Sequence, residues 1–323
     1  MSKFNHILCV MTELQDPEEL LNYAISVCRH HDAKLTVMLS LEPLPPNANM
    51  VMESFSYVDT FSSMQEAAKE RLESLAEQFR DRYTFDTVLK MGRVSLEVAK
   101  AVKEVDADLV LKKAKTDFLD RLFGSEDMRL LSKCPVPVWM THSGDSKQFR
   151  KVVAAVDVNY HYPPEELKVR KQLNECVVVQ AAQIAVQEGA ELHIVHVLDD
   201  HIDMVIYDGI VDLGAGAYTD ESPDSSKERE QAVKQLIEPI RSANPDDVID
   251  KLRIKTTVKS GSPRREIPVL VKDIDADLLV MGTVARVGIP GFLMGNTAET
   301  ILSQVNCSVL ALKPQGFVSP IIT

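Results

Sequence analysis

The sequence predicts an α/β fold that occurs twice, as two tandem domains that each hold a five-stranded parallel sheet flanked by helices. The chain has 323 residues, a length that suits two domains. Short apolar runs alternate with longer segments of helical periodicity, as in parallel α/β sheets. The order of these elements repeats, and the run Asp-Ala-Asp-Leu begins at Asp106 and again at Asp275.

The first half of each copy follows the same order. Strands are predicted over 7–11 and 152–156, helices over 17–31 and 165–188, and second strands over 34–39 and 191–197. An amphipathic helix comes next in each copy. Its apolar face is formed by Ala68, Leu72, Leu75 and Phe79 in one copy and by Val233, Leu236 and Ile240 in the other.

The second half of each copy is also matched. The third strands, 88–92 and 258–261, end in a glycine, and a glutamate follows each glycine at the same offset, at Glu97 and Glu266. The fourth strands are the Asp-Ala-Asp-Leu segments, and the fifth cover 136–140 and 308–312. Pro135 and Pro137 favour an edge position for the fifth strand of the first copy, because proline has no N–H for a sheet ladder.

The polar segment 145–148 places the boundary between domains 1–145 and 149–315. The connections 43–64 and 199–226 exceed ordinary loop lengths, so we expect lids or additional surface elements there. Their apolar residues either pack over the domains themselves or cover a cavity for an amphiphilic small molecule, and both interpretations stay open.

Composition excludes several classes of protein. A net charge of -12 disfavours nucleic-acid binding, and no apolar run reaches the ~18 residues of a membrane span. The five cysteines form no CxxC pair and no export signal precedes them, so we expect a cytoplasmic protein with reduced thiols. His193 and His196 point to opposite faces of a strand, which predicts structural histidines and no metal site. No catalytic constellation is recognisable.

A strand, a glycine-containing loop and a helix follow one another in the second copy, which is an arrangement that binds phosphate. Gly282 ends the fourth strand, and Gly295 precedes Asn296 and Thr297 at the start of a helix. The first copy has Lys112 and Lys113 at the matching place. The loop chemistry is therefore expected in the second copy alone.

The stretch from Met281 to Gly288, with Gly295 to Glu299, resembles the nucleotide loop of the universal stress protein family. The family pattern is glycine, two residues, glycine, nine residues, glycine, then serine or threonine. This chain keeps the spacing, with Ala285 and Asn296 at two of those positions. The run 134–138 and the tandem layout resemble the family too, so the resemblance covers nearly the whole chain.

The resemblance implies two adenine-nucleotide-hydrolase-like, Rossmann-like domains, packed as a pseudo-dimer through their fifth strands. It also implies that ATP or another adenine nucleotide, with Mg, binds the C-terminal domain. Asp157 would lie by the adenosine, where the first copy has Thr12, and Val197 would border the base. Met281 would also belong to the site, Arg286 would be near enough to assist, and the residues that would line the phosphates are Gly282, Ala285, Gly295, Asn296 and Thr297.

The resulting hypothesis is a non-catalytic, cytoplasmic stress-response protein that acts as a sensor or scaffold for an unknown protein partner. A further homodimer stays open. Three alternatives also stay open: a scaffold without nucleotide, a binder of an amphiphilic small molecule, and a weak ATPase. The methyl group of Ala285 bears on the choice, because strain at a close backbone approach costs on the order of 1–3 kcal/mol.

Overall fold

The computed structural model describes residues 3–12, 17–41, 54–115, 123–142, 148–159, 164–198, 223–243, 252–283 and 294–319. These residues form two compact units. The N-terminal unit holds Ser2–Ala114, Ser125–Met140 and Ser319–Thr323, and the C-terminal unit holds Lys115–Gly124 and Thr141–Val318. In the described part of the chain, no helix is both long and apolar enough to cross a membrane.

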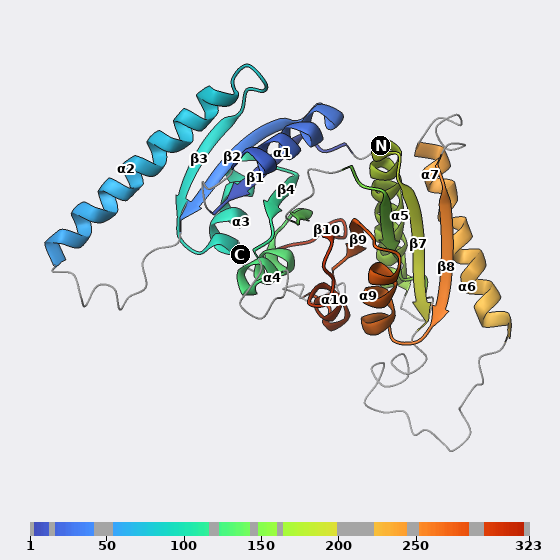
Figure 1. The fold of residues 1–323 in the computed structure, drawn as a ribbon. Helices are drawn as coiled ribbons and strands as arrows, with labels where there is room; N and C mark the ends of the chain where they lie inside the picture. The colour runs from blue at the N-terminus through green and yellow to red at the C-terminus, as the bar shows by residue number, and fades with distance from the viewer. Residues whose placement is uncertain are drawn as a thin grey trace. The chain divides into compact units, whose positions relative to one another are not determined.

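The N-terminal unit has a parallel sheet in the order β3-β2-β1-β4-β5, of which Figure 1 labels β1 to β4. Its strands are β1 (His6–Met11), β2 (Lys34–Leu41), β3 (Asp86–Met91), β4 (Leu109–Lys113) and β5 (Val138–Thr141). Its helices are α1 (Pro17–His31), α2 (Ser54–Phe79), α3 (Val94–Val105) and α4 (Ser125–Lys133).

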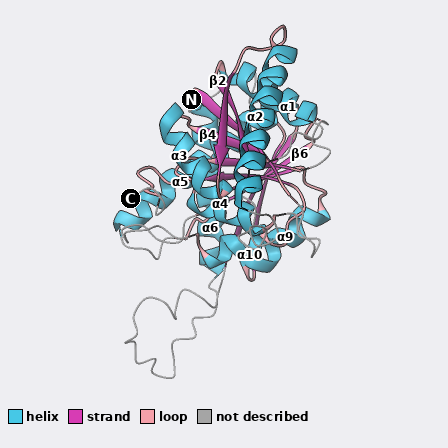
Figure 2. Cartoon of the chain, turned by 90° about the vertical axis from the view of Figure 1, so that its left-hand side faces the viewer, coloured by secondary structure: helices cyan, strands magenta, loops and turns pink. Residues whose placement is uncertain are grey.

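The C-terminal unit repeats this arrangement in the order β10-β9-β6-β7-β8. Its strands are β6 (Lys151–Ala155), β7 (Glu191–Leu198), β8 (Ile254–Ser260), β9 (Leu278–Gly282) and β10 (Ser308–Leu312). Its helices are α5 (Pro164–Glu188), α6 (Pro223–Gln235), α7 (Ile237–Ala243), α9 (Pro263–Asp273) and α10 (Asn296–Leu302). The strands are mostly buried, with helices packed around them (Figure 2), which confirms the predicted fold class.

Strand pairing gives the correspondence between the two units residue by residue. His6 pairs with Lys34 in one unit, and Lys151 pairs with Glu191 in the other. Ile7 pairs with Leu109, and Val152 pairs with Leu278. Thr12, Lys112 and Lys113 therefore occupy the positions of Asp157, Met281 and Gly282, as the sequence repeat predicts.

The same glycine turn occurs at matched positions of the two units. Gly92 and Gly261 have positive φ angles of 151° and 137°, and each N–H donates to the end of the second strand of its unit. A Cβ on Gly92 would lie 2.9 Å from Cγ of Glu97, and one on Gly261 would lie 3.0 Å from Cγ of Glu266. The repeated glycine–glutamate spacing thus reflects a strand-to-helix turn that only glycine fits without strain.

Three elements differ from the sequence prediction. Helix α2 begins at Ser54, inside the segment 43–64 that was expected to be a connection, while 43–53 and 199–222 lie outside the described residues. The amphipathic helix of the C-terminal unit is interrupted at Leu236, because Pro239 has no N–H to donate four residues back. Strand β5 begins at Val138, two residues after the predicted start, because Pro137 cannot donate to the ladder.

Candidate functional site

The C-terminal sheet has its topological switch point between β6 and β9. Strand β6 comes first in the unit, and the chain continues on one side to β7 and β8 and later returns on the other side to β9 and β10. In open parallel sheets, ligands bind outside the carboxyl ends of the strands at such a point. Asp157 follows β6 and Gly282 ends β9 at this edge.

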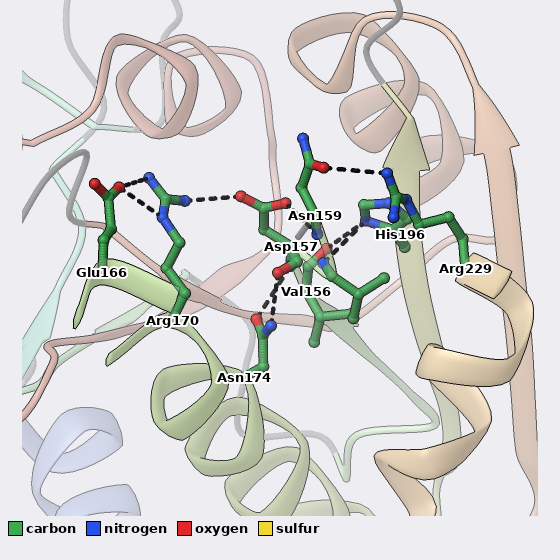
Figure 3. Close-up of polar contacts among 9 residues, drawn as sticks. Val156, Asp157, Asn159, Glu166, Arg170, Asn174, His196 and Arg229 are labelled. Atoms are coloured by element: carbon green, nitrogen blue, oxygen red, sulfur yellow. Dashed lines mark hydrogen bonds and ion pairs between the residues drawn. The ribbon is translucent and has the colours of Figure 1, made fainter. Parts of the chain in front are cut away.

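The backbone after β6 is held by buried side chains (Figure 3). The N–H of Asp157 donates to Oδ1 of Asn174 at 3.0 Å, and Nδ2 of Asn174 donates to the Asp157 carbonyl at 2.7 Å. Asn174 is 7% exposed. Nδ1 of His196 lies 3.1 Å from the carbonyl oxygen of Val156, so this histidine, which was predicted to be structural, supports the same turn.

The carboxylate of Asp157 is held by two donors. Nη1 of Arg170 donates to Oδ2 at 2.8 Å, and the N–H of Asn159 donates to Oδ1 at 3.2 Å. Arg170 also contacts Oε1 of Glu166, through Nε at 2.9 Å and Nη2 at 2.8 Å. The Asp157 side chain is still 44% exposed, so its carboxylate can accept hydrogen bonds from a ligand.

A cavity of about 250 Å³ opens beside Asp157, between α5 and the α6–α7 segment. Arg170 and Asn174 line it from α5, and Gln235 and Leu236 line it from the opposite wall. Arg229 is buried near this place and donates from Nη2 to Oδ1 of Asn159 at 3.2 Å. The cavity combines a few polar groups with apolar walls, as small-molecule sites do.

The end of β9 is packed against α5. A Cβ on Gly282 would lie 2.5 Å from Cδ2 of Leu173, so the absence of a side chain at 282 is what allows the helix to approach. Met281 is buried, and so is Val197 near the end of β7, which lies on the other side of β6. These two residues supply apolar surface at the carboxyl edge of the sheet.

The start of α10 lies near the end of β9. The N–H of Gly295 donates to the carbonyl of Thr283 at 3.1 Å, and Nε of Arg264 lies 3.5 Å from Oγ1 of Thr297. Asn296 is exposed. Ala285 and Arg286 lie outside the described residues. The described part of the predicted site therefore gathers at one edge of the sheet.

The N-terminal unit differs at the matched positions. Lys112 forms an ion pair with Asp127, with Nζ 2.8 Å from Oδ1 and both side chains 4% exposed. Lys113, at the position of Gly282, pairs with Glu19 at 2.5 Å. Charged side chains of the unit itself fill the place that corresponds to the end of β9. The sequence predicted the two lysines here but not their partners.

The N-terminal unit has a wider hollow of about 370 Å³, lined by Asn22, Ile25, Ser26, Arg29 and Arg82. Arg29 and Arg82 lie at the end of α1 and just before β3, near the amino ends of the strands. Parallel sheets bind ligands at the opposite edge. The hollow is therefore a weaker candidate than the site beside Asp157.

Sequence reasoning missed Glu166, Arg170 and Asn174, and the signal that reveals them is their spacing. They lie four residues apart, so they follow one stripe of α5, and the stripe ends at a residue that is 7% exposed. A polar stripe that runs into a buried position indicates specific partners, because burying an unpaired polar group is costly.

Comparisons with known proteins agree with this architecture. The model of the universal stress protein family matches residues 3–142 and 173–313. The chain is 27% identical to the universal stress protein E homolog of Haemophilus influenzae, over 97% of this chain and 98% of that protein.

Two solved structures share the fold over 96% of this chain. A putative universal stress protein from Pseudomonas aeruginosa has a TM-score of 0.64 at 21% identity, with 94% of that protein covered. A universal stress protein from Archaeoglobus fulgidus has a TM-score of 0.60 at 18% identity, with 96% covered. With family matches in both of its halves, the chain belongs to the universal stress protein family.

Proposed function

We propose that the C-terminal unit binds one adenine nucleotide, ATP or a relative with Mg, at the carboxyl ends of β6, β7 and β9. One observation carries the proposal: at the switch point this unit has an accessible carboxylate and a strand that ends in glycine, whereas the N-terminal unit has Thr12 and Lys113. The edge is where such sheets bind nucleotides, and Asp157 is suited to accept hydrogen bonds from ribose hydroxyls.

The N-terminal unit, in this proposal, binds no nucleotide. Its matched position holds the buried Lys112–Asp127 pair, and Lys113 replaces the glycine. Displacing a buried, mutually neutralising pair would leave charges without partners, which is strongly unfavourable. The expected stoichiometry is therefore one nucleotide per chain.

We further propose that the protein is a non-catalytic, cytoplasmic sensor or scaffold of the stress response, which passes nucleotide occupancy to a protein partner. In the described site the carboxylate of Asp157 is held by Arg170 and the N–H of Asn159. The other possible bases in Figure 3 are engaged as well, since Glu166 contacts Arg170 and Nδ1 of His196 lies 3.1 Å from the carbonyl oxygen of Val156. Single-turnover ATP hydrolysis above background that is lost in Asp157→Ala would contradict the non-catalytic part of the proposal.

The binding proposal is tested by isothermal titration of the whole chain with Mg-ATP and, in a separate titration, with ATP in the presence of EDTA. We expect one site, weakened at least tenfold by Asp157→Ala, because a hydrogen bond to a charged group contributes roughly 1.5–3 kcal/mol. Thr12→Ala is the matched control at the corresponding strand end of the N-terminal unit, and it should bind as the wild type does. Two ATP sites per chain, or an equal loss of ATP affinity in both variants, would contradict the proposal.

The cavity of about 250 Å³ favours one second candidate, a binder of a small amphiphilic molecule. Leu167, Ala232, Leu236 and Pro239 give it apolar walls beside its polar groups. Mass measurement of a solvent extract of the purified chain distinguishes the two. A recovered amphiphile, together with no ATP binding, would favour this alternative.

A further inference from the structure

Helix α5 begins well before its counterpart. It has 25 residues and α1 has 15, yet both helices end at the same place in their units. The N–H of Ala33 donates to the carbonyl of Cys28, and the N–H of Ala190 donates to that of Ala185. Asn174 therefore corresponds to Pro17, the first residue of α1, and the additional turns of α5 are residues 164–173.

These additional turns carry the side chains that reach Asp157 and β9. Glu166 and Arg170 come from them, and so does Leu173, which covers Gly282. The family match for the second half begins at residue 173. The clasp formed by Glu166 and Arg170 thus precedes the part of the chain that the family model matches.

The clasp fixes the orientation of one carboxylate. Arg170 is 19% exposed and bridges Glu166, which is 15% exposed, to Oδ2 of Asp157. The N–H of Asn159 holds Oδ1, and Asn174 holds the backbone on both sides of the carboxylate-bearing carbon. A carboxylate held on both oxygens offers its remaining acceptor positions in fixed directions, so a ligand does not have to immobilise it.

The charges of the clasp also determine which ligand groups are favoured next to the Asp157 carboxylate. Arg170 contacts two carboxylates, so its positive charge is already compensated. An arginine beside a ribose-binding acid can receive a 2′-phosphate when it is free to do so. Here the compensated guanidinium and the Asp157 carboxylate disfavour a dianion and favour neutral hydroxyl donors.

We infer that Arg170 is a positioning residue that aligns the Asp157 carboxylate with the two adjacent hydroxyls of a ribose, and so makes the site selective for ribonucleotides. This inference rests on the proposed nucleotide function. A 2′-deoxyribose lacks one donor and leaves an oriented acceptor unpaired, and sites built to bind a hydroxyl reject ligands that lack it. Selectivity therefore depends on the orientation that Arg170 imposes.

The test is a titration of the whole chain with Mg-ATP, with the 2′-deoxy analogue, and with ATP that carries a 2′-phosphate. We expect the wild type to prefer ATP over the deoxy analogue at least tenfold. Arg170→Met should weaken ATP about fivefold to tenfold and leave the deoxy analogue nearly unchanged, because only the paired hydroxyls use the imposed orientation. Arg170→Lys keeps one contact to Asp157 and should restore part of the preference.

Lys168 supplies the matched control, since it is an exposed cation on the same additional turns. Lys168→Met removes one positive charge there and should leave both affinities unchanged. Circular dichroism of each variant verifies folding, and Arg170→Gln gives a second, more polar replacement if Arg170→Met fails to fold.

The other outcomes overturn the inference in distinguishable ways. Equal weakening of both nucleotides by Arg170→Met would mean a purely structural role, and tighter ATP binding would mean that Arg170 competes with the ligand. Preferred binding of the 2′-phosphate form would make Arg170 a phosphate ligand. If the wild type binds no nucleotide, the proposed function itself is wrong. If it binds ATP and the 2′-deoxy analogue equally well, only this inference is wrong.

Discussion

Lys112 of β4 and Asp127 of α4 form a buried ion pair, with Nζ 2.8 Å from Oδ1 and each side chain 4% exposed. Nζ of Lys112 also donates to the carbonyl of Lys113 at 3.0 Å. The matched residues of the C-terminal unit are Met281 on β9 and Ala298, the third residue of α10, and both are buried. The matched positions on strand and helix are thus charged in one unit and apolar in the other.

This difference between the two units can be tested by measuring the stability of substituted chains. Lys112→Met and Asp127→Ala, made singly, should each destabilise the N-terminal unit by about 3–5 kcal/mol, because each leaves a buried charge without its partner. The double variant reproduces the Met–Ala pair of the C-terminal unit and should recover most of the loss. Urea unfolding followed by the fluorescence of Trp139, the one tryptophan of the sequence, reports on this unit.

Lys113→Met is the control for a charge change at the neighbouring position. Lys113 and Glu19 are 36% and 32% exposed, so their pair contributes about 0–1 kcal/mol. A double Lys112→Met and Asp127→Ala variant as unstable as either single one would show that the pair is essential to folding and not a substitute for apolar packing.

The sequence predicts the fold well because the signals for the strands are local. Apolar runs and the glycine–glutamate spacing each reflect the structure of a short stretch of chain, whereas the Asp-Ala-Asp-Leu segment recurs although its contacts are distant in the sequence. The carboxylates of Asp108 and Asp277 show why the repeat persists: each accepts backbone N–H bonds at the start of the first strand of its unit. These features appear in the sequence at fixed offsets.

The site was less accessible to prediction, because its partners are distant in the sequence or lack a periodic signal. Asp157 and Gly282 could be placed at the carboxyl edge from strand order alone. The contact of Leu173 with Gly282 joins residues more than a hundred positions apart. The helix was predicted over 165–188, but its polar contacts with Asp157 leave no trace in an apolar pattern. The assignment of nucleotide contacts to Gly295, Asn296 and Thr297 stays a prediction.

Gly282 is expected to be intolerant of substitution for a reason unrelated to ligands. A Cβ there would lie 2.5 Å from Cδ2 of Leu173, so Gly282→Ala should destabilise the C-terminal unit by about 1–3 kcal/mol through overpacking. Leu173→Ala in the same chain makes room and should return part of that loss. Differential scanning calorimetry measures both. If Gly282→Ala melts as the wild type does, Leu173 moves aside freely and the contact is not limiting.

His31 should make the N-terminal unit sensitive to acid. Burial is the main reason that the pKa of His31 is lowered to about 4. The nearby His30 and Lys3 lower this pKa further, whereas the Asp108 carboxylate acts in the opposite direction. Its Nδ1 accepts the N–H of Phe4 at 3.3 Å, and protonation would remove that acceptor. In the unfolded chain the histidine has a pKa near 6.5, so on acidification the unfolded state binds the proton before the folded state does. The free energy of unfolding should therefore fall as the pH drops from about 6.5 to 4, and this group should leave it constant above pH 6.5.

Unfolding at a series of pH values, followed by Trp139 fluorescence, checks this behaviour. His31→Asn should be less stable at pH 7 but lose less on acidification, because the titrating group is gone. The same slope in both proteins between pH 6.5 and 4 would assign the acid sensitivity to other groups.

Asn174 should control the order of the backbone that carries Asp157. Asn174→Leu removes the acceptor of the Asp157 N–H and the donor to its carbonyl, at a cost of about 1–3 kcal/mol for each group left unsatisfied in a buried place. Amide hydrogen exchange should become faster in peptides that cover 152–159. Peptides that cover 6–12, the matched strand of the N-terminal unit, are the internal control and should not change. Equal acceleration in both strands would mean that the substitution destabilises the whole chain, whereas unchanged exchange in 152–159 would mean that His196 alone holds this turn.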